Sequence, residues 1–195
     1  MNYYNKYVFF SLFFFIFFIF FDLEARNKKG MLSVGLGYYN FLRNGYLEEQ
    51  YGVPGGEYQS SKSKASYAGS IEYYFSHKYR LFRIIQPHIG FMGTHKESFY
   101  SWFGLGADIF LGKRRKIILH PNLAVGYMTG QQRDIQLGYQ IEFKSGGDIM
   151  YRLKNGSRIG IGGYHLSNAA LGEHSTLGTL NPGSEVVLFK YQVPF

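Results

Sequence analysis

The sequence contains no cysteine, and this absence excludes several classes of function. A chain without thiols is not a disulfide-stapled scaffold, does not hold zinc through thiolates and does not act through a cysteine nucleophile. Charged residues are also few, at 17% of the 195 residues, and acidic or Gln/Ser-rich tracts are missing. This composition argues against a disordered protein. The length fits one domain or two small ones.

The chain also lacks an apolar run of about 20 residues, the length that a transmembrane helix needs. Its long apolar stretch is residues 8–21, and a mean hydropathy of −0.17 is too low for a bundle of membrane helices. Lys6 precedes this stretch and Ala25 follows it, in the order of a secretory signal peptide. We therefore expect residues 1–25 to be a cleaved signal peptide and residues 26–195 to be one exported domain. An uncleaved N-terminal anchor is the alternative.

Removing the signal peptide raises the net charge. It takes away Lys6, Asp22 and Glu24 and leaves 20 basic and 11 acidic residues, a net charge of +9. We expect an anionic membrane surface as the partner rather than nucleic acid, because no spacing typical of a nucleic-acid-binding motif is present. Charge alone also allows a basic soluble protein.

Apolar and polar residues alternate with a period of two throughout the exported part, and no convincing helical period follows residue 26. The alternation predicts eight strands, at about 32–38, 66–75, 85–91, 99–111, 117–127, 140–152, 158–167 and 185–195. Most exceed the 5–6 residues or so usual in soluble proteins and approach the roughly 9–11 residues of a membrane-spanning strand. An even number of strands, apolar on one face and small or polar on the other, is typical of outer-membrane barrels. We predict an all-β fold, an eight-stranded antiparallel transmembrane β-barrel in the bacterial outer membrane.

The connections between these strands alternate in length, as they do in such barrels. We place the long loops 42–64 and 169–184 outside the cell and the short turns 76–79, 112–115 and 154–157 in the periplasm. The last strand ends at Phe195 and resembles the terminal aromatic signature of outer-membrane barrels. We expect Trp102 and tyrosines to form interfacial girdles, and strand glycines to thin the lumen face.

One predicted strand end carries residues suited to chemistry. Strand 158–167 places His165 and Ser167 on its lipid-facing side, and the next strand places Glu185 on the same side. A His–Ser pair with a carboxylate is the arrangement of a serine hydrolase, in which Glu185 orients His165 and His165 takes the Ser167 proton. Asn168, or backbone N–H groups of the following loop, would stabilise an oxyanion. The alternative is that these polar residues lie in the head-group zone, where they cost little.

Two further histidines, His88 and His120, fall on the predicted lumen face. They share it with four polar residues, Asp108, Asn122, Glu142 and Asp148. We expect these residues to form a polar network that fills a narrow barrel rather than a metal site. The Gly-x-Gly segments lie within strands without a following helix, so they are not nucleotide-binding loops. We therefore expect no metal and no cofactor.

A family resemblance rests on two C-terminal segments. Residues 163–170, Gly-Tyr-His-Leu-Ser-Asn-Ala-Ala, followed by residues 181–185, Asn-Pro-Gly-Ser-Glu, and a closing aromatic strand resemble the outer-membrane lipid A 3-O-deacylases, the PagL-type family. The resemblance is specific over about residues 160–195 and only architectural elsewhere. It implies a serine esterase that removes the ester-linked 3-O acyl chain, a 3-hydroxyacyl group, from lipid A of lipopolysaccharide in the outer leaflet.

The resemblance also implies roles for individual residues. His165 falls at the position of the general base, Ser167 at the nucleophile and Glu185 at the orienting acid. Asn168 and Ala170 fall at oxyanion or substrate-binding positions, and Ala170 stands where the family often has glycine. The loop before Glu185 looks longer than in the family, so Glu173 is a rival carboxylate; we prefer Glu185 because it keeps the strand alternation.

Other functions remain open at this point. A small barrel without catalysis, such as an adhesin or a stability factor, would act through loop 42–64. Another lipid A-modifying barrel, such as a palmitoyl transferase, would need an acyl pocket inside the barrel. The sequence leaves acyl-chain preference and the choice between a monomer and a homodimer undecided.

Overall fold

The computed structural model describes residues 30–42, 65–76, 79, 81, 84–130, 133–135, 137, 139–169 and 183–194. Its strands are β1 (Met31–Tyr39), β2 (Ser66–Tyr74), β3 (Ile85–Thr94), β4 (Phe99–Ala107), β5 (Ile109–Leu111), β6 (Ile117–Thr129), β7 (Ile141–Arg152), β8 (Arg158–Ser167) and β9 (Ser184–Pro194). Within these ranges, no helix is long and apolar enough to cross a membrane.

Strands β4 and β5 form one continuous line of the barrel wall. Both pair with β6 in the same register, and only Asp108 separates them. The same register would place Ala107 opposite Pro121 of β6, and proline has no backbone N–H to donate across the ladder. The wall therefore has eight strand positions, as the sequence predicts, with one of them interrupted.

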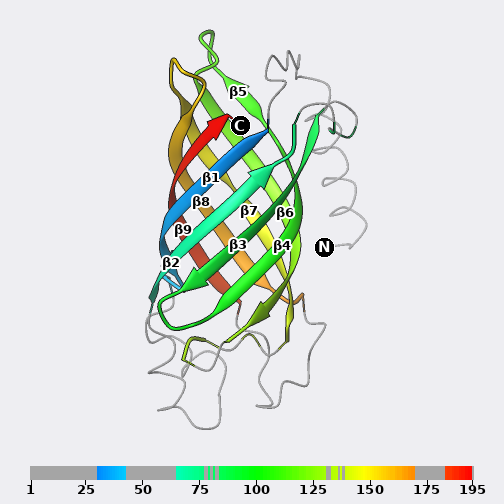
Figure 1. The fold of residues 1–195 in the computed structure, drawn as a ribbon, viewed down its shortest axis with the longest axis vertical. Coiled ribbons are helices and arrows are strands. Elements are labelled where there is room, and N and C mark those ends of the chain that lie inside the picture. The colour runs from blue at the N-terminus through cyan, green and yellow to red at the C-terminus, as the bar shows by residue number, and fades with distance from the viewer. Residues whose placement is uncertain are drawn as a thin grey trace, which may run out of the picture.

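The strands close into an antiparallel barrel (Figure 1). The order around the wall is β4-β3-β2-β1-β9-β8-β7-β6-β5, and pairing of β4 with β6 completes the circle. A closed barrel has no unpaired sheet edge, so its backbone polar groups are satisfied within a bilayer. The predicted fold class is confirmed.

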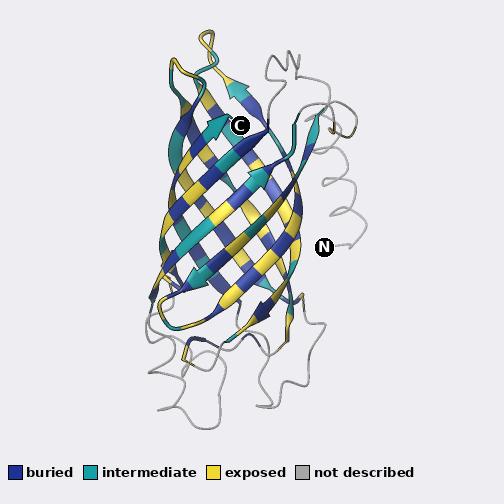
Figure 2. Ribbon diagram, viewed as in Figure 1, coloured by how far each residue is buried: buried dark blue, intermediate teal, exposed yellow. Residues whose placement is uncertain are grey.

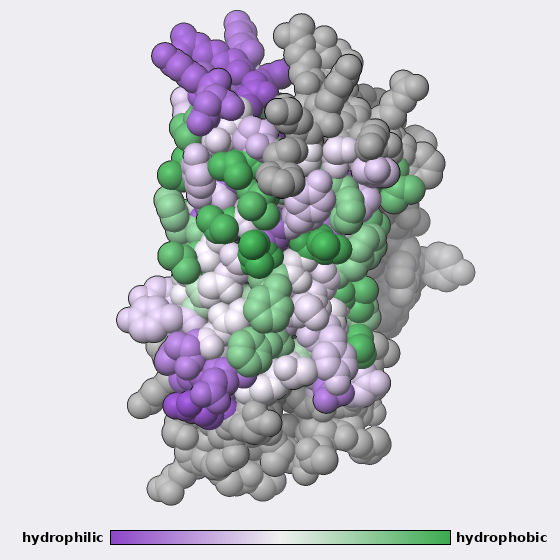
Figure 3. Space-filling view, in the orientation of Figure 1, coloured by the Kyte–Doolittle hydropathy of each residue, from purple (hydrophilic) through white to green (hydrophobic). Residues whose placement is uncertain are grey.

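Side chains alternate between the two faces of the wall, as the checkerboard of buried and exposed residues in Figure 2 shows. The outward positions carry large apolar residues such as Leu36, Ile71, Leu123 and Ile149, all of them exposed. On the face drawn in Figure 3, strongly hydrophilic residues gather toward the two ends and hydrophobic residues lie between them. This distribution suits a barrel whose middle contacts lipid.

Charged residues fill the lumen and pair with one another. The fully buried Lys190 Nζ lies 2.8 Å from Glu72 Oε1 and 3.1 Å from both oxygens of Asp148. It also donates to the Tyr164 hydroxyl over 2.7 Å. Burial of a charge is costly unless it is paired and hydrogen-bonded, and these contacts meet that condition.

A second group of buried polar residues surrounds Asp108. Arg158 donates to its two oxygens over 2.9 and 2.8 Å, and His120 Nδ1 lies 2.8 Å from Oδ1. The residues that the sequence assigned to the lumen are all buried: His88, Asp108, His120, Asn122, Glu142 and Asp148. The prediction that they line the interior is confirmed.

The expected girdle role of Trp102 is wrong. Trp102 is only 6% exposed and points into the barrel, where its ring stacks on Tyr100 at 5.1 Å and lies 4.2 Å from Lys144 Nζ. Gly90 makes room for it, because a Cβ at that position would come within 2.3 Å of the indole. Several tyrosines do occupy exposed outward positions: Tyr38, Tyr67, Tyr127, Tyr151 and Tyr191.

The two ends of the barrel differ in the length of their connections. One end carries the connections 40–65, 95–98, 130–140 and 168–183, and the other carries 75–84, 112–116 and 153–157. The predicted asymmetry is therefore present, although the connection 75–84 is longer than the expected turn 76–79. The expected signal peptide, loop residues 43–64 and 170–182, and Phe195 lie outside the described residues.

Candidate active site on the outer barrel wall

Strands β8 and β9 bring two of the predicted site residues together. Their antiparallel register places His165 directly opposite Glu185. On β8, Tyr164 and Leu166 point into the barrel and are buried, so His165 and Ser167 occupy the outward positions. Because side chains alternate with a period of two, the three residues share the outer face near the end that carries the long connections.

The imidazole of His165 contacts the carboxylate of Glu185. The Nδ1 atom lies 3.3 Å from Glu185 Oε1, and the two side chains are 45% and 19% exposed. A carboxylate at Nδ1 favours the tautomer that carries its proton there, which leaves Nε2 as the basic atom. The imidazole is therefore oriented by a partner and still accessible from outside the barrel.

Gly183 packs against the other side of the imidazole. Its φ is +65°, and a Cβ built on it would lie 2.5 Å from His165 Cε1 and 2.9 Å from Nε2. Only glycine adopts this conformation readily and also leaves room for the ring. Glu185 and Gly183 thus hold His165 from two directions.

Strand β8 ends at Ser167, and the next two residues turn the chain away from the wall. Asn168 is fully buried, and its Nδ2 donates to the Leu137 carbonyl over 3.1 Å. Ala169 has a φ of +53°, and its backbone N–H donates to Ser167 Oγ over 3.3 Å. The Asn168 side chain therefore faces the interior, whereas a backbone N–H faces the serine. Ala170 and Glu173 lie outside the described residues.

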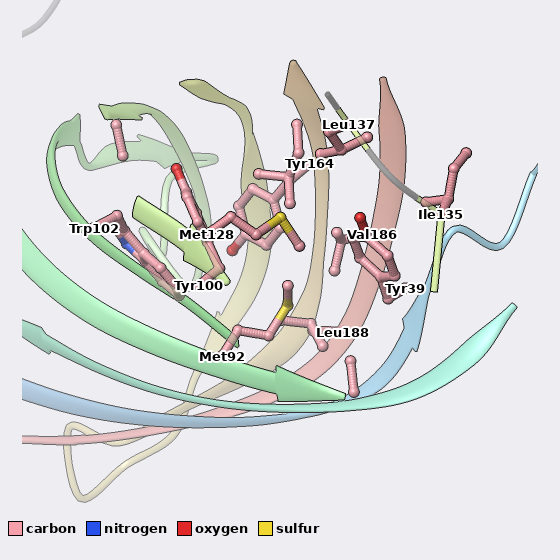
Figure 4. Packing of buried hydrophobic residues seen from close by; sticks show 13 residues of the cluster. Tyr39, Met92, Tyr100, Trp102, Met128, Ile135, Leu137, Tyr164, Val186 and Leu188 are labelled. Carbon is pink, nitrogen blue, oxygen red and sulfur yellow. The ribbon is translucent and has the colours of Figure 1, made fainter. Parts of the chain in front are cut away.

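The connection between β6 and β7 supplies the Leu137 carbonyl and is itself anchored in the barrel mouth. Asp134 is fully buried and accepts hydrogen bonds from Ser66, Thr94 and Ser98. Ile135 and Leu137 are also fully buried and belong to the interior cluster, where Figure 4 shows Ile135 near Val186 and Leu137 near Tyr164. This connection links the barrel core to the turn that follows Ser167.

Ser145 is an outward residue of the site that the sequence analysis missed. It lies on β7 directly opposite His165 and is exposed. The alternation within β7 already gives its side, but its neighbour across the sheet depends on the β7–β8 register. That register depends on the type of the turn 153–157 as well as on its length.

The site thus offers an oriented base, the hydroxyl group of Ser167 and a backbone donor at the barrel end that carries the long connections. These are the groups that acyl transfer to water requires. Over the described ranges, no three His, Asp or Glu side chains are grouped as metal ligands would be.

Comparison with known proteins points to one family. The sequence profile of the family described as lipid A 3-O-deacylase (PagL) matches residues 88–194, more than half of the chain. No curated protein matches the chain.

Two solved structures resemble the fold. The crystal structure of the outer membrane enzyme PagL aligns with a TM-score of 0.53 and 15% identity, over 85% of this chain and 99% of that chain. A de novo designed transmembrane β-barrel aligns with a TM-score of 0.50 and 12% identity, over 88% of this chain and 100% of that chain. The likeness to a designed barrel shows architecture, while the profile match extends over the strands that carry His165, Ser167 and Glu185. The chain therefore belongs to the lipid A 3-O-deacylase (PagL) family of outer-membrane enzymes.

Proposed function

We propose that this protein hydrolyses the ester that links an acyl chain to the 3 position of lipid A, with Ser167 as nucleophile, His165 as general base and Glu185 as orienting acid. The observation that carries the proposal is the 3.3 Å contact between His165 Nδ1 and Glu185 Oε1, on the same outward face as Ser167. A serine, a histidine and a carboxylate in this relation form a triad whatever the fold that presents them.

The reaction would proceed in two steps. His165 takes the proton of Ser167 as its Oγ attacks the ester carbonyl, and then protonates the leaving sugar oxygen, so that the acyl chain is held on Ser167. Water, activated by the same imidazole, then attacks the acyl-enzyme and releases the fatty acid. The Glu185 side chain stabilises the imidazolium that forms in each step.

Backbone donors after Ser167 would stabilise the oxyanion of each step. The N–H of Ala169 already points at Ser167 Oγ, over 3.3 Å. We propose that Asn168 supports this donor by holding the turn through its bond to Leu137, and that Ala170 contributes a further N–H. Preorganised donors of this kind contribute about 2.7–4 kcal/mol each to lowering the barrier.

An outer-wall site suits a substrate that lies in the bilayer. His165 is 45% exposed, so an ester in the outer leaflet reaches it by lateral diffusion. The cavity inside the barrel behind β8 measures about 10 Å³, lined by Glu72, Tyr164 and Leu166 among others, and has no room for an acyl chain. This cavity therefore does not serve as the interior acyl pocket that a palmitoyl transferase would need.

All three proposed catalytic side chains come from one chain, so the proposed reaction needs no second copy. We further propose that residues 1–25 direct export and are removed, which leaves residues 26–195 as the barrel.

The nucleophile assignment is tested with two neighbouring serines. Ser167→Ala should abolish release of fatty acid from lipid A by the purified protein in detergent, measured by mass spectrometry of the products. Ser145→Ala is the matched control, because Ser145 is also an outward serine next to His165, and it should keep most of the activity. Loss of activity in Ser145→Ala with activity retained in Ser167→Ala would refute the assignment.

A further inference from the structure

Three aromatic rings form a continuous row on the outer wall beside the proposed triad. The ring centroids of Tyr38 and Tyr67 are 5.1 Å apart, and those of Tyr67 and His95 are 5.5 Å apart. Tyr38 is 45% and Tyr67 64% exposed, and His95 is exposed as well. We call these three residues the ring ledge.

The backbone fixes one end of the ring ledge. The Tyr67 N–H donates to His95 Nδ1 over 2.9 Å, and the His95 N–H donates to the Tyr67 carbonyl over 3.0 Å. Because Nδ1 accepts a hydrogen bond, a neutral His95 carries its proton on Nε2. The ring is thus held in one orientation, with a hydrogen-bond donor left for a ligand.

The strand register places the ring ledge close to the triad. Tyr38 pairs with Val187 of β9, which lies two residues from Glu185 on the same outward face. Neighbouring strands are about 4.7–4.9 Å apart, so Tyr38 lies roughly 10 Å across the wall from β8. Both groups sit near the barrel end that carries the long connections, where tyrosine marks the membrane interface.

On the basis of the proposed function, we propose that the ring ledge binds the glucosamine head group of the lipid A molecule whose ester lies at Ser167. Lipid A is a phosphorylated glucosamine disaccharide that carries several acyl chains. The apolar C–H face of such a sugar packs on aromatic rings, and His95 Nε2 donates to a sugar or phosphate oxygen. A head group held there extends across the wall from the ester toward β2 and β3.

The opposite flank of the triad presents a different surface. Tyr127 of β6 is also 45% exposed and also stands two strands from β8, with β7 between them. Its hydroxyl donates to Gln140 Oε1 over 2.6 Å, whereas the Tyr38 hydroxyl is hydrogen-bonded with the Tyr67 side chain, within the ring ledge. Tyr38 and Tyr127 therefore form a matched pair of interfacial tyrosines, of which only Tyr38 belongs to the ring ledge.

The test compares Tyr38→Leu and Tyr67→Leu with Tyr127→Leu in kinetics on lipid A in mixed micelles. We expect each ledge variant to raise KM about tenfold with kcat close to that of the wild type, because the lost contact acts in binding. Tyr127→Leu should leave both constants unchanged. An unchanged KM in the ledge variants, or an equal rise in Tyr127→Leu, would overturn the proposal.

A binding measurement keeps the ledge distinct from the chemistry. In a Ser167→Ala background, the Kd for lipid A should rise with Tyr67→Leu and not with Tyr127→Leu. If the wild type fails to turn over lipid A, the proposed function is wrong; if it turns over lipid A while the ledge variants bind normally, only the ledge is wrong.

Discussion

The imidazole of His165 is held between a carboxylate and a glycine. Glu185 contacts Nδ1 at 3.3 Å, and the missing side chain of Gly183 leaves the space into which the ring fits. Each partner acts on a different property of the base. Glu185 favours the tautomer that carries the proton on Nδ1, and we propose that Gly183 sets the position of the ring relative to Ser167.

Gly183→Ala should therefore lower kcat by about 100-fold, because displacement of a catalytic group by about 1 Å has effects of this size. Gly112→Ala is the control. Gly112 has a similar φ of +72° but nothing within 4 Å of the added Cβ, so both variants carry the same backbone strain and only one reaches His165. Folding is checked by the shift in gel mobility on heating. Equal kcat values in the two variants would show that Gly183 does not position the base.

The identity of the acid is decided by two glutamates. Glu185→Ala should cost far more activity than Glu173→Ala in the same assay of fatty-acid release, because Glu185 contacts the imidazole directly. The reverse order would assign the acid to the 170–182 segment and would show that the alignment of this segment with the family is wrong.

The shared outward face of His165, Ser167 and Glu185 could be predicted because strand alternation leaves only two sides. The inward direction of the Asn168 side chain could not be predicted, because strand alternation no longer applies after β8 ends at Ser167.

For Trp102, strand alternation was the better guide and the expectation from residue type was wrong. Trp102 alternates in step with Tyr100 and Gly104, which places it on the lumen side. The preference of tryptophan for membrane interfaces suggested the lipid-facing side instead. The space left by Gly90 explains how the indole fits inside the barrel.

The connection between β6 and β7 acts as an element that joins the external mouth to the site. Asp134 gathers three hydroxyl groups from β2, β3 and the hairpin that follows it, while Leu137 accepts the bond from Asn168. The buried side chains beside it in Figure 4 keep this connection against the barrel core.

Asp134→Ala should loosen this connection and lower kcat about tenfold, because three buried hydroxyl groups lose a charged acceptor and hydrogen bonds to charged groups contribute about 1.5–3 kcal/mol each. Limited proteolysis within residues 130–140 should become faster while the barrel stays folded. Glu97→Ala is the control, since its pair with Arg133 is 67% and 63% exposed and exposed pairs contribute little. If Asp134→Ala keeps full activity, the connection does not support the site.

At the level of elements, the number of strands and their facing residues followed from periodicity. The break between β4 and β5 could be understood only from their pairing with β6. Pro121 lies on β6, and the strand that it interrupts is the neighbouring one. The connection 75–84 was predicted too short, since apolar residues such as Leu81 continue beyond the turn without adding a strand.

In the whole molecule, the lumen and the outer wall have separate tasks. Paired charges, including Lys190 with Glu72 and Asp148, fill the interior of a closed barrel. The chemistry we propose takes place on the outside, where the wall meets the outer leaflet. Such a division lets a rigid barrel present catalytic groups to a lipid that never leaves the membrane.

The membrane context also follows from the whole molecule rather than from any one strand. The barrel is oriented by three features together: its lipid-facing apolar residues, its closed wall and the long connections at one end. At the other end, Met31 pairs with Pro194 and joins the first strand to the last. The proposed triad then lies at the external leaflet, where lipid A resides.

The proposed activity is tested most directly by the position-resolved mass spectrum of lipid A from an outer membrane that carries the protein. With the wild type, we predict lipid A that lacks the single acyl chain ester-linked at the 3 position, and with Ser167→Ala in equal amount we predict unmodified lipid A. Unmodified lipid A in the presence of folded wild-type barrel, or identical loss of the chain with both proteins, would contradict the account.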